Sequence, residues 1–200
     1  MTAYKVTGSS PVAMTLRAPK SAVSDTRKLT ATRIEVSDNT NVEVGVILGG
    51  EIRFRNALIS GNTTAVSLFV QEFDSNYGKR MEVENATIVG SWYGVFWWNA
   101  FTNLSVKNTI IANHSKGALT GSTTSAWLSY SNVYGNVGGD STAAAGGSNN
   151  STTNPLFTNA TTGDFTLASG SPAIHAGDAL ILNKDGTRSD MGAYGGPGAW

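Results

Sequence analysis

Apolar residues alternate with polar ones in short segments along the middle of the chain, and these segments repeat. Residues 54–62, 83–91 and 106–114 align without a gap, and each has Asn at its third position. Successive segments begin 29 and then 23 residues apart. Alternation with a period of two is typical of strands that bury one face. Repeats of this length are typical of solenoids, so the pattern predicts a coil of short β-strands.

The alignment places apolar residues in four columns, which we expect to face the interior. Asn occupies the turn between strands, where it tolerates a left-handed backbone and offers its side-chain amide to the next rung. Parallel strands lie about 4.8 Å apart, so each column would form a continuous apolar stack. The columns are Ile52, Met81 and Leu104; Phe54, Val83 and Val106; Ile59, Ile88 and Ile111; and Val66, Val95 and Ala118, with Asn56, Asn85 and Asn108 at the turn.

Four motifs follow in the C-terminal part: Asn154-Pro-Leu-Phe157, Gly163-Asp-Phe-Thr-Leu167, Gly170-Ser-Pro-Ala-Ile174 and Asp185-Gly-Thr-Arg-Ser-Asp-Met-Gly-Ala-Tyr194. With the Val-x-Asn-x-x-Ile segments, they give the chain a pattern that resembles the pectin-lyase-like superfamily of right-handed parallel β-helices, especially secreted bacterial members. The family pattern usually has Asp where this chain has His175. The resemblance implies the fold and a C-terminal cap. It implies no single activity, because the superfamily includes lyases, hydrolases, epimerases, tailspikes and inert scaffolds.

We therefore expect one all-β domain over residues 1–200, a right-handed parallel β-helix of about five rungs with a cap at each end. Residues 1–32 would form a lead-in that caps the first rung, because an open sheet edge invites pairing with other chains. Residues 33–136 would form the repeating rungs. Residues 137–153, rich in Gly, Ser and Ala, predict a flexible loop, and residues 154–200 would close the far end.

Composition excludes several functions. The chain has 14 basic and 14 acidic residues, so no net charge draws it to nucleic acid. It has no cysteine, which excludes disulfides and thiolate metal sites. The longest apolar stretch, residues 92–98, is too short to span a membrane. The N-terminus does not read as a signal peptide, so the expected extracellular or cell-surface location rests on the resemblance.

An aromatic segment, residues 91–98, is the main candidate site. By the alternation of the fourth column, Phe96 and Trp98 face outward beside Phe69 of the preceding rung. A flat Phe69–Trp98 pair with Phe96 would stack on sugars or be buried by a partner protein. The alternative is that the insertion in the longer rung, or the lead-in, covers these rings as a satellite core. The predicted ligand-binding residues are Phe69, Phe96, Trp98, Glu72, Asp74, Lys79 and Arg80.

Outward charged residues alternate in sign along the rungs, with Arg53 beside Glu82 and Arg55 beside Glu84. One interpretation is a groove for anionic polysaccharide, since lyases of this superfamily place calcium ligands and a basic residue on such a strand. We favour a cross-rung ion ladder that holds the register. A calcium site needs clustered carboxylates, and these charges alternate.

Residues 183–190 place oxygen ligands at alternating positions around a Gly, loosely as in a calcium loop. The segment lacks a bidentate Glu and contains Arg188. We therefore favour a turn in which Arg188 pairs with Asp190 or Asp178, and we expect no cofactor other than calcium. The calcium alternative would use Asn183, Asp185 and Asp190.

The expected function is a secreted or surface module that binds polysaccharide, with no catalysis or a vestigial active site. No catalytic residue is assigned, because His114 and His175 lie 61 residues apart and suggest neither a triad nor a zinc site. One alternative is a structural scaffold, such as a stalk or tailspike segment, whose aromatic patch joins copies of the chain into a homo-oligomer. The other is a small polysaccharide lyase or hydrolase that uses Glu72, Asp74, Glu82 or Glu84 as acid, base or calcium ligand.

Overall fold

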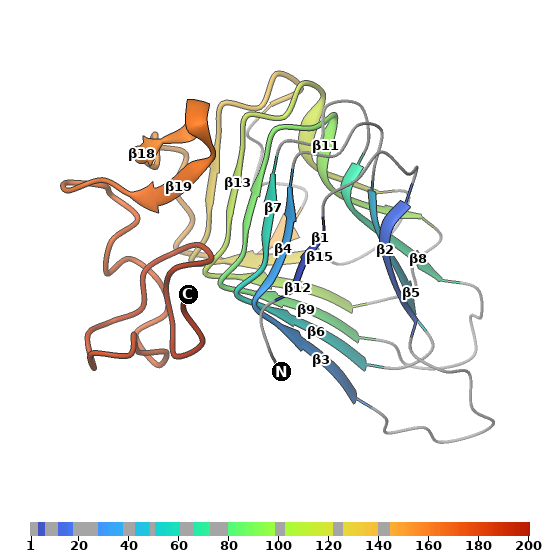
Figure 1. Ribbon diagram of the computed structural model, residues 1–200, viewed down its shortest axis with the longest axis horizontal. Coiled ribbons are helices and arrows are strands. Elements are labelled where there is room, and N and C mark those ends of the chain that lie inside the picture. Colours follow the sequence, from blue (N-terminus) through green and yellow to red (C-terminus); the bar gives the residue numbers. More distant parts are fainter. Residues whose placement is uncertain are drawn as a thin grey trace.

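The structure is a computed structural model, and Figure 1 shows its arrangement. It describes residues 4–6, 12–17, 28–37, 43–48, 51–60, 66–72, 80–98, 103–121, 126–139 and 145–200. This part of the chain is all-β apart from one short 3-10 helix, η1 (Ala160–Thr162). Within these ranges, no helix has the length and apolar character needed to cross a membrane.

Three parallel sheets, here named A, B and C, carry the repeating part. From β1 to β15, successive strands fall in turn in sheets A, B and C, and each return to a sheet lands one strand further along. This topology is β-solenoid-like, and it confirms the parallel strands predicted for residues 33–136, within the described part of that range. Sheet A consists of β1 (Tyr4–Val6), β4 (Ile34–Ser37), β7 (Leu58–Ser60), β10 (Thr87–Val89), β13 (Ile110–Ala112) and β16 (Asn132–Tyr134). Sheet B consists of β2 (Val12–Arg17), β5 (Glu43–Leu48), β8 (Val66–Glu72), β11 (Tyr93–Trp98) and β14 (Gly117–Gly121), and sheet C of β3 (Lys28–Thr32), β6 (Glu51–Arg55), β9 (Arg80–Glu84), β12 (Asn103–Lys107), β15 (Ala126–Ser129) and β17 (Ala145–Gly146).

The repeating pattern extends beyond both of its predicted ends. Within residues 1–32, which the sequence predicts as a lead-in, β1, β2 and β3 pair in parallel with β4, β5 and β6. At the other end, β17 pairs with β15, and Ser151 bridges to Asn132 on β16. The Asn150 side chain also donates to the carbonyl of Leu128 at 2.8 Å. Residues 145–151 therefore add part of a further rung, where the sequence predicts a flexible loop over 137–153.

Three of the four predicted columns are confirmed by the strand register. Their described side chains are buried and belong to the main hydrophobic cluster, which lies between the three sheets. Alternating β-branched residues fit this arrangement, because they pack well on a pleated surface with one buried face. The confirmed columns are Ile52, Met81 and Leu104; Phe54, Val83 and Val106; and Ile59, Ile88 and Ile111.

The fourth predicted column is wrong. Val95 lies in register with Leu68 on β8 and Leu119 on β14, and not with Val66 and Ala118. The chain between sheets A and B is two residues longer before β8 than before β11. A turn can lengthen without disturbing the strands on either side, so an alignment without gaps loses the register there.

The turn that leads from sheet C into sheet A repeats one backbone geometry, and we call it the asparagine corner. Its residues have φ of 56° at Arg33, 53° at Asn56, 52° at Asn85, 50° at Asn108 and 50° at Tyr130. Each donates its backbone N–H to a carbonyl oxygen of the next rung, at 3.0 to 3.3 Å. Asn adopts this left-handed conformation more readily than most residues. The predicted Asn stack is confirmed, and Nδ2 of Asn108 lies 3.5 Å from Oδ1 of Asn85.

The C-terminal region lies beside the asparagine corner, on the outside of the solenoid (Figure 1). The sequence predicts that residues 154–200 close the far end, but residues 177–198 run along the side, back toward the earlier rungs. Side chains of the corner hold this segment through its backbone. The bonds are Asp178 N–H to Asn108 Oδ1 at 2.7 Å, Asn85 Nδ2 to the Asp190 carbonyl at 2.9 Å, Asn56 Nδ2 to the Gly195 carbonyl at 2.7 Å and Arg33 Nε to the Gly198 carbonyl at 3.1 Å.

The same region covers the outer face of sheet A. Leu58, Val89 and Ile110 alternate with the inward isoleucines, yet all three are buried. They pack in two further clusters against the C-terminal region, which includes the antiparallel strands β18 (Phe157–Asn159) and β19 (Asp164–Leu167). The covering side chains are Phe157, Phe165, Leu167, Ala173, Ala176, Met191, Ala193 and Tyr194. Strands β7, β10 and β13 are thus buried on both faces.

Candidate functional site

The strand register changes the predicted aromatic pair. Phe96 on β11 lies beside Phe69 on β8, whereas Trp98 lies beside Gln71. The predicted Phe69–Trp98 pair is therefore wrong, because Phe69 lies beside the outward residue that comes two positions before Trp98. The cause is the longer turn before β8, which also displaced the fourth column. For Phe69 and Trp98, the structure describes the position of the backbone in the strand. The neighbouring pair that the register provides is Phe69 with Phe96.

Within the 91–98 segment, the described aromatic side chains gather at the start of β11, and we call Trp92, Tyr93 and Phe96 the aromatic cluster. Trp92 is 40% exposed, and the other two are partly exposed. The ring centroids of Tyr93 and Phe96 lie 5.6 Å apart, with planes tilted by 49°. Nζ of Lys116 lies 3.8 Å from the ring centroid of Trp92 and 5.8 Å from that of Tyr93. This places a cation over one face of the Trp92 indole.

Tyr93 and Phe96 share a face because β11 departs from strict alternation. Residues three apart on a regular strand point to opposite faces, but here Gly94 and Val95 are both buried. A Cβ on Gly94 would lie 2.5 Å from Cγ2 of Ile111 and 2.6 Å from the Ala118 carbonyl oxygen. Only glycine fits at position 94. The missing side chain therefore lets two successive residues face the core and returns Phe96 to the side of Tyr93.

The cluster is held at the turn from sheet A into sheet B, which we call the histidine corner. The turn residues Gly90, Asn113 and Gly135 have φ of 71°, 59° and 67°. Backbone bonds join its rungs: Ser115 N–H donates to the Ser91 carbonyl, and Lys116 N–H to the Trp92 carbonyl, both at 2.8 Å. These bonds attach the backbone beneath Trp92 to the following rung.

His114 is fully buried behind this corner. Its Nδ1 accepts the Ser91 N–H at 3.2 Å and lies 3.0 Å from the Ser91 hydroxyl oxygen, and its Nε2 donates to the Ile88 carbonyl at 3.1 Å. Acceptance at Nδ1 together with donation at Nε2 requires the neutral ring. Burial lowers the pKa of His114 from 6.5 to about 4. The ring is uncharged at neutral pH and contacts backbone groups, so its role is structural.

The outward charges of sheet C form the predicted ion ladder. Nε of Arg53 lies 2.8 Å from a carboxylate oxygen of Glu82, and Nε of Arg55 lies 3.3 Å from one of Glu84. These pairs confirm the structural interpretation. They also leave Glu82 and Glu84 neutralised by arginines, which is unfavourable for a calcium ligand.

The ladder continues into the C-terminal region through Lys107 and Asp178. Nζ of Lys107 donates to Oδ2 of Asp178 at 2.8 Å, and this hydrogen bond is the main reason that the pKa of Asp178 is lowered. The backbone N–H of Leu180 and the charge of Arg188 lower it further, against the effect of burial. Lys107 is thus the direct partner of Asp178, and Arg188 acts on it only through space.

The remaining predicted ligand-binding residues stay untested. Glu72 ends β8 and Arg80 begins β9, where their backbones are described. Asp74 and Lys79 lie outside the described residues. The predicted polar wall around the aromatic site therefore stays a prediction.

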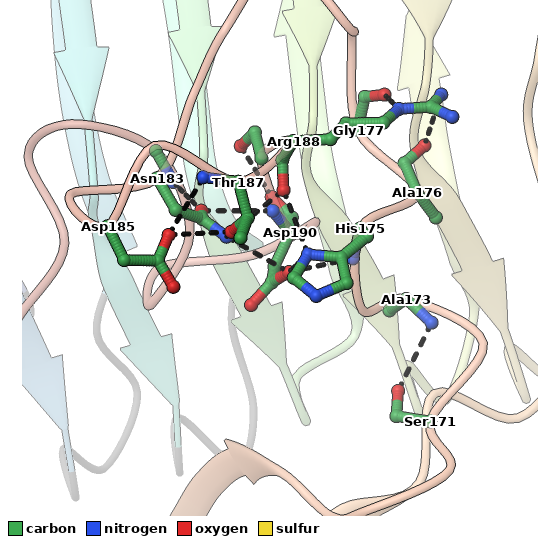
Figure 2. A network of polar contacts seen from close by, with 12 residues as sticks. Ser171, Ala173, His175, Ala176, Gly177, Asn183, Asp185, Thr187, Arg188 and Asp190 are labelled. Atoms are coloured by element: carbon green, nitrogen blue, oxygen red, sulfur yellow. Dashed lines mark hydrogen bonds and ion pairs between the residues drawn. The ribbon is translucent and has the colours of Figure 1, made fainter.

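The 183–190 segment forms a hydrogen-bonded turn (Figure 2). Asp185 Oδ1 accepts from the Thr187 backbone N–H at 2.9 Å and from its hydroxyl at 2.6 Å, and these bonds lower the pKa of Asp185. Asn183 Nδ2 donates to Asp190 Oδ1 at 3.2 Å. Nε of Arg188 donates to the Gly177 carbonyl at 2.6 Å, in place of the predicted carboxylate partner.

His175 joins two parts of this turn. Its backbone N–H donates to Asp190 Oδ1 at 2.7 Å, and its Nδ1 lies 3.1 Å from the Arg188 carbonyl. The described residues contain no group of three His, Cys, Asp or Glu side chains placed to hold a metal. Calcium binding by Asn183, Asp185 and Asp190 stays a prediction.

Sequence reasoning missed Trp92 and Lys116, which carry the most exposed part of the aromatic cluster. A signal was present in the repeat, because Ser115-Lys116 follows Ser91-Trp92 by 24 residues, close to one rung. It also missed Trp127 on the outer face of sheet C, which is 57% exposed. Trp127 stands on a different sheet from the cluster.

Comparison with known proteins adds no relative. A scan against protein-family models, a search of curated proteins and a search of solved structures each found no match. Functional inference for this chain therefore rests on its motifs and on the geometry above.

Proposed function

We propose that this chain is a right-handed parallel β-helix of the pectin-lyase-like type, which acts as a secreted or cell-surface module and binds a polysaccharide without catalysis. Parallel strands connected through a crossover are right-handed in about 98% of cases, which supports this handedness for the coil of sheets A, B and C. The Val-x-Asn-x-x-Ile rungs and the tail motifs support the family.

The observation that carries the binding proposal is the aromatic cluster on a rigid strand. Trp92 is substantially exposed, and Tyr93 and Phe96 stand beside it with rings 5.6 Å apart. Flat rings fixed by a sheet bury apolar sugar faces at little entropic cost. Lys116 covers one face of Trp92, so a sugar would stack on the other face and donate or accept hydrogen bonds at the rim.

The lyase alternative has less support from the described carboxylates. Glu82 and Glu84 are paired with arginines, and general acid–base chemistry needs a carboxyl or imidazole of suitable pKa that reaches substrate. His114 is buried and its ring bonds to backbone groups. The lyase reading would therefore depend on Glu72 and Asp74.

A fluorescence titration with a panel of neutral and acidic oligosaccharides tests the proposal. We expect binding to change tryptophan emission, and Trp92→Ala and Phe96→Ala to weaken binding by about tenfold, since an aromatic contact contributes roughly 1 kcal/mol beyond its buried area. Trp127→Ala is the matched control, because it removes an exposed tryptophan from another sheet and should leave binding unchanged.

Three outcomes would contradict the proposal. A silent wild type across the panel, together with a stable oligomer that Trp92→Ala dissociates, would assign the cluster to a homo-oligomer interface and favour the scaffold. Equal weakening by Trp127→Ala would move the site to sheet C. Release of unsaturated or reducing sugar ends during the titration would establish a lyase or hydrolase.

A further inference from the structure

Three buried polar side chains, Ser91, His114 and Asn136, stack on successive rungs behind the histidine corner. His114 N–H donates to Asn136 Oδ1 at 3.0 Å, as Ser91 N–H donates to His114 Nδ1 at 3.2 Å. Asn136 Nδ2 donates to the Ile111 carbonyl at 3.3 Å, and His114 Nε2 to the Ile88 carbonyl at 3.1 Å. His114 and Asn136 thus make the same pair of contacts to the preceding rung, but only His114 can gain a proton.

A second proton on the ring removes one of these contacts. It would lie on Nδ1, which could then donate to the Ser91 hydroxyl oxygen 3.0 Å away but could no longer accept the Ser91 N–H. The ring would also carry a full charge among apolar atoms, including Cγ2 of Ile111 beside Gly94.

No charge in direct contact offsets that cost. The elements packed on the ring are β10, β11, β13, β14 and the segment after β16, together with the turn that carries His114 itself. Among their described residues, the titratable groups are Tyr93, Lys116 and Tyr134. The pKa of His114 is lowered by burial, against the effect of the Ile88 and Ser91 backbone hydrogen bonds, and no charged neighbour contributes.

The turn that His114 holds is the one that carries the aromatic cluster. Trp92 and Tyr93 follow Ser91 directly, and the Ser91 hydroxyl donates to the Tyr93 carbonyl at 2.8 Å. The Ser91 carbonyl accepts from Ser115, next to Lys116, whose ammonium covers Trp92. Loss of the Ser91–His114 contact would therefore remove the bond to the core from the backbone that carries Trp92 and Tyr93, and leave it attached through the bonds from Ser115 and Lys116.

We propose that neutral His114 is a positioning residue for the aromatic cluster, and that protonation of its ring in acid releases the Ser91–Tyr93 turn. Binding of glycan would then be lost reversibly at acid pH. That consequence rests on the proposed function, whereas the opening of the turn does not.

Native-state hydrogen exchange at the Ser91 amide tests the opening without any ligand. The open turn exposes a ring with its ordinary pKa of 6.5, while the closed turn holds it at about 4. The opening constant, after correction for intrinsic exchange rates, should therefore rise on the order of 100-fold between neutral pH and about pH 4. The control amide is that of Ser131, which donates to Asn150 Oδ1 at 3.1 Å. This hydrogen bond also joins two rungs through a side chain, but neither of its groups titrates. The opening constant of the Ser131 amide should therefore stay nearly constant.

His114→Asn is the matched variant, because Asn136 already makes the same contacts one rung further along. Its Ser91 amide should show none of the acid-dependent rise. If this variant does not fold, NMR titration of the wild-type His114 ring gives a second measurement, since ring protonation and Ser91 opening should share one midpoint.

The proposal is overturned if the rise persists in His114→Asn. It is also overturned if Ser131 rises equally, which would mean global unfolding, or if the ring titrates without opening at Ser91. A failure of glycan binding at neutral pH would contradict the proposed function and leave this exchange result unaffected.

Discussion

The two corners that flank sheet A use the same backbone and differ in what they contact. Both place a residue with positive φ at each turn: Asn85 at the asparagine corner and Asn113 at the histidine corner are one example of each. The asparagine corner directs its side chains outward, into the backbone of residues 177–198. The histidine corner directs polar side chains inward, where His114 and Asn136 bond the preceding rung.

This difference explains where the chain tolerates changes in length. The chain from the inward residue of sheet C to that of sheet A has the same length in successive rungs, as from Phe54 to Ile59 and from Val83 to Ile88. The C-terminal segment bonds several of these corners at once, so a change in length at one corner would move its side chain away from its partner. The hydrogen bonds described at the histidine corner join neighbouring rungs, and the chain beyond it varies in length before β8, β11 and β14. A side chain that is exposed on this corner, such as Trp92, can therefore be added without disturbing the ladder.

The substitution with the largest expected effect on stability is in the core between the two corners. Ile88 lies between them on β10, fully buried and in register with Ile59 and Ile111. Ile88→Ala should lower the free energy of unfolding by about 2–5 kcal/mol, because neighbours fixed by the sheet cannot collapse into the cavity. Chemical denaturation measures it. A loss well below 1 kcal/mol would mean that this column does not carry the core.

The two corners should lose stability in different ranges of acid pH. The folded pKa of His114 is about 4, below its unfolded value of 6.5, so the unfolded state binds the proton first. Stability at the histidine corner is fully present above pH 6.5 and falls by about 3 kcal/mol as pH drops toward 4. At the asparagine corner, the pKa of Asp178 is lowered in the folded state. Its contribution to stability is therefore fully present above the unfolded pKa of 3.8 and is lost only as pH falls below that value.

Urea denaturation at a series of pH values measures both windows. In His114→Asn, the free energy of unfolding should stay constant between pH 6.5 and 4, and it should still fall below pH 3.8. A wild type whose stability stays constant from pH 6.5 to pH 4 would show that the ring is not held neutral in the folded state.

The smallest effect is a difference between two matched substitutions. Asn85→Ala and Asn113→Ala both force alanine into a left-handed backbone. Only Asn85→Ala also removes buried bonds, to Ser189 Oγ at 3.0 Å and the Asp190 carbonyl at 2.9 Å. Asn85→Ala should therefore cost about 1–3 kcal/mol more in unfolding free energy. Equal costs would mean that the C-terminal segment contributes no stability through this corner.

Much of the parallel core could be predicted from the sequence, because its signals are local. Alternation around Phe54, Val83 and Val106 defines a strand with one buried face, and Asn at each turn supplies the left-handed residue. The cover on sheet A has a signal too. Leu58 and Val89 directly adjoin inward isoleucines, and consecutive apolar residues on a strand indicate burial on both faces. The sequence could not predict the path of the covering segment. The asparagine side chains bond its backbone carbonyls, and these are present at every residue, so no side-chain pattern marks the contact.

The candidate site was predicted less well, for physical reasons that involve single residues. The Phe69–Trp98 pair assumed equal turn lengths, and two extra residues before β8 moved Phe69 beside Phe96. The pairing of Tyr93 with Phe96 on one face depends on Gly94, whose lack of a side chain allows two successive buried residues. Alternation alone predicts the opposite arrangement.

The reverse course of residues 177–198 has a consequence for how the chain folds. Neighbouring rungs are close in sequence and can form one after another during synthesis. The contact between Arg33 and Gly198 joins residues 165 positions apart, so it can form only after Gly198 has left the ribosome. Until then Leu58, Val89 and Ile110 face water along an unfinished sheet. We expect docking of this segment to be the slow step of folding, and the growing chain to be most prone to aggregation just before it.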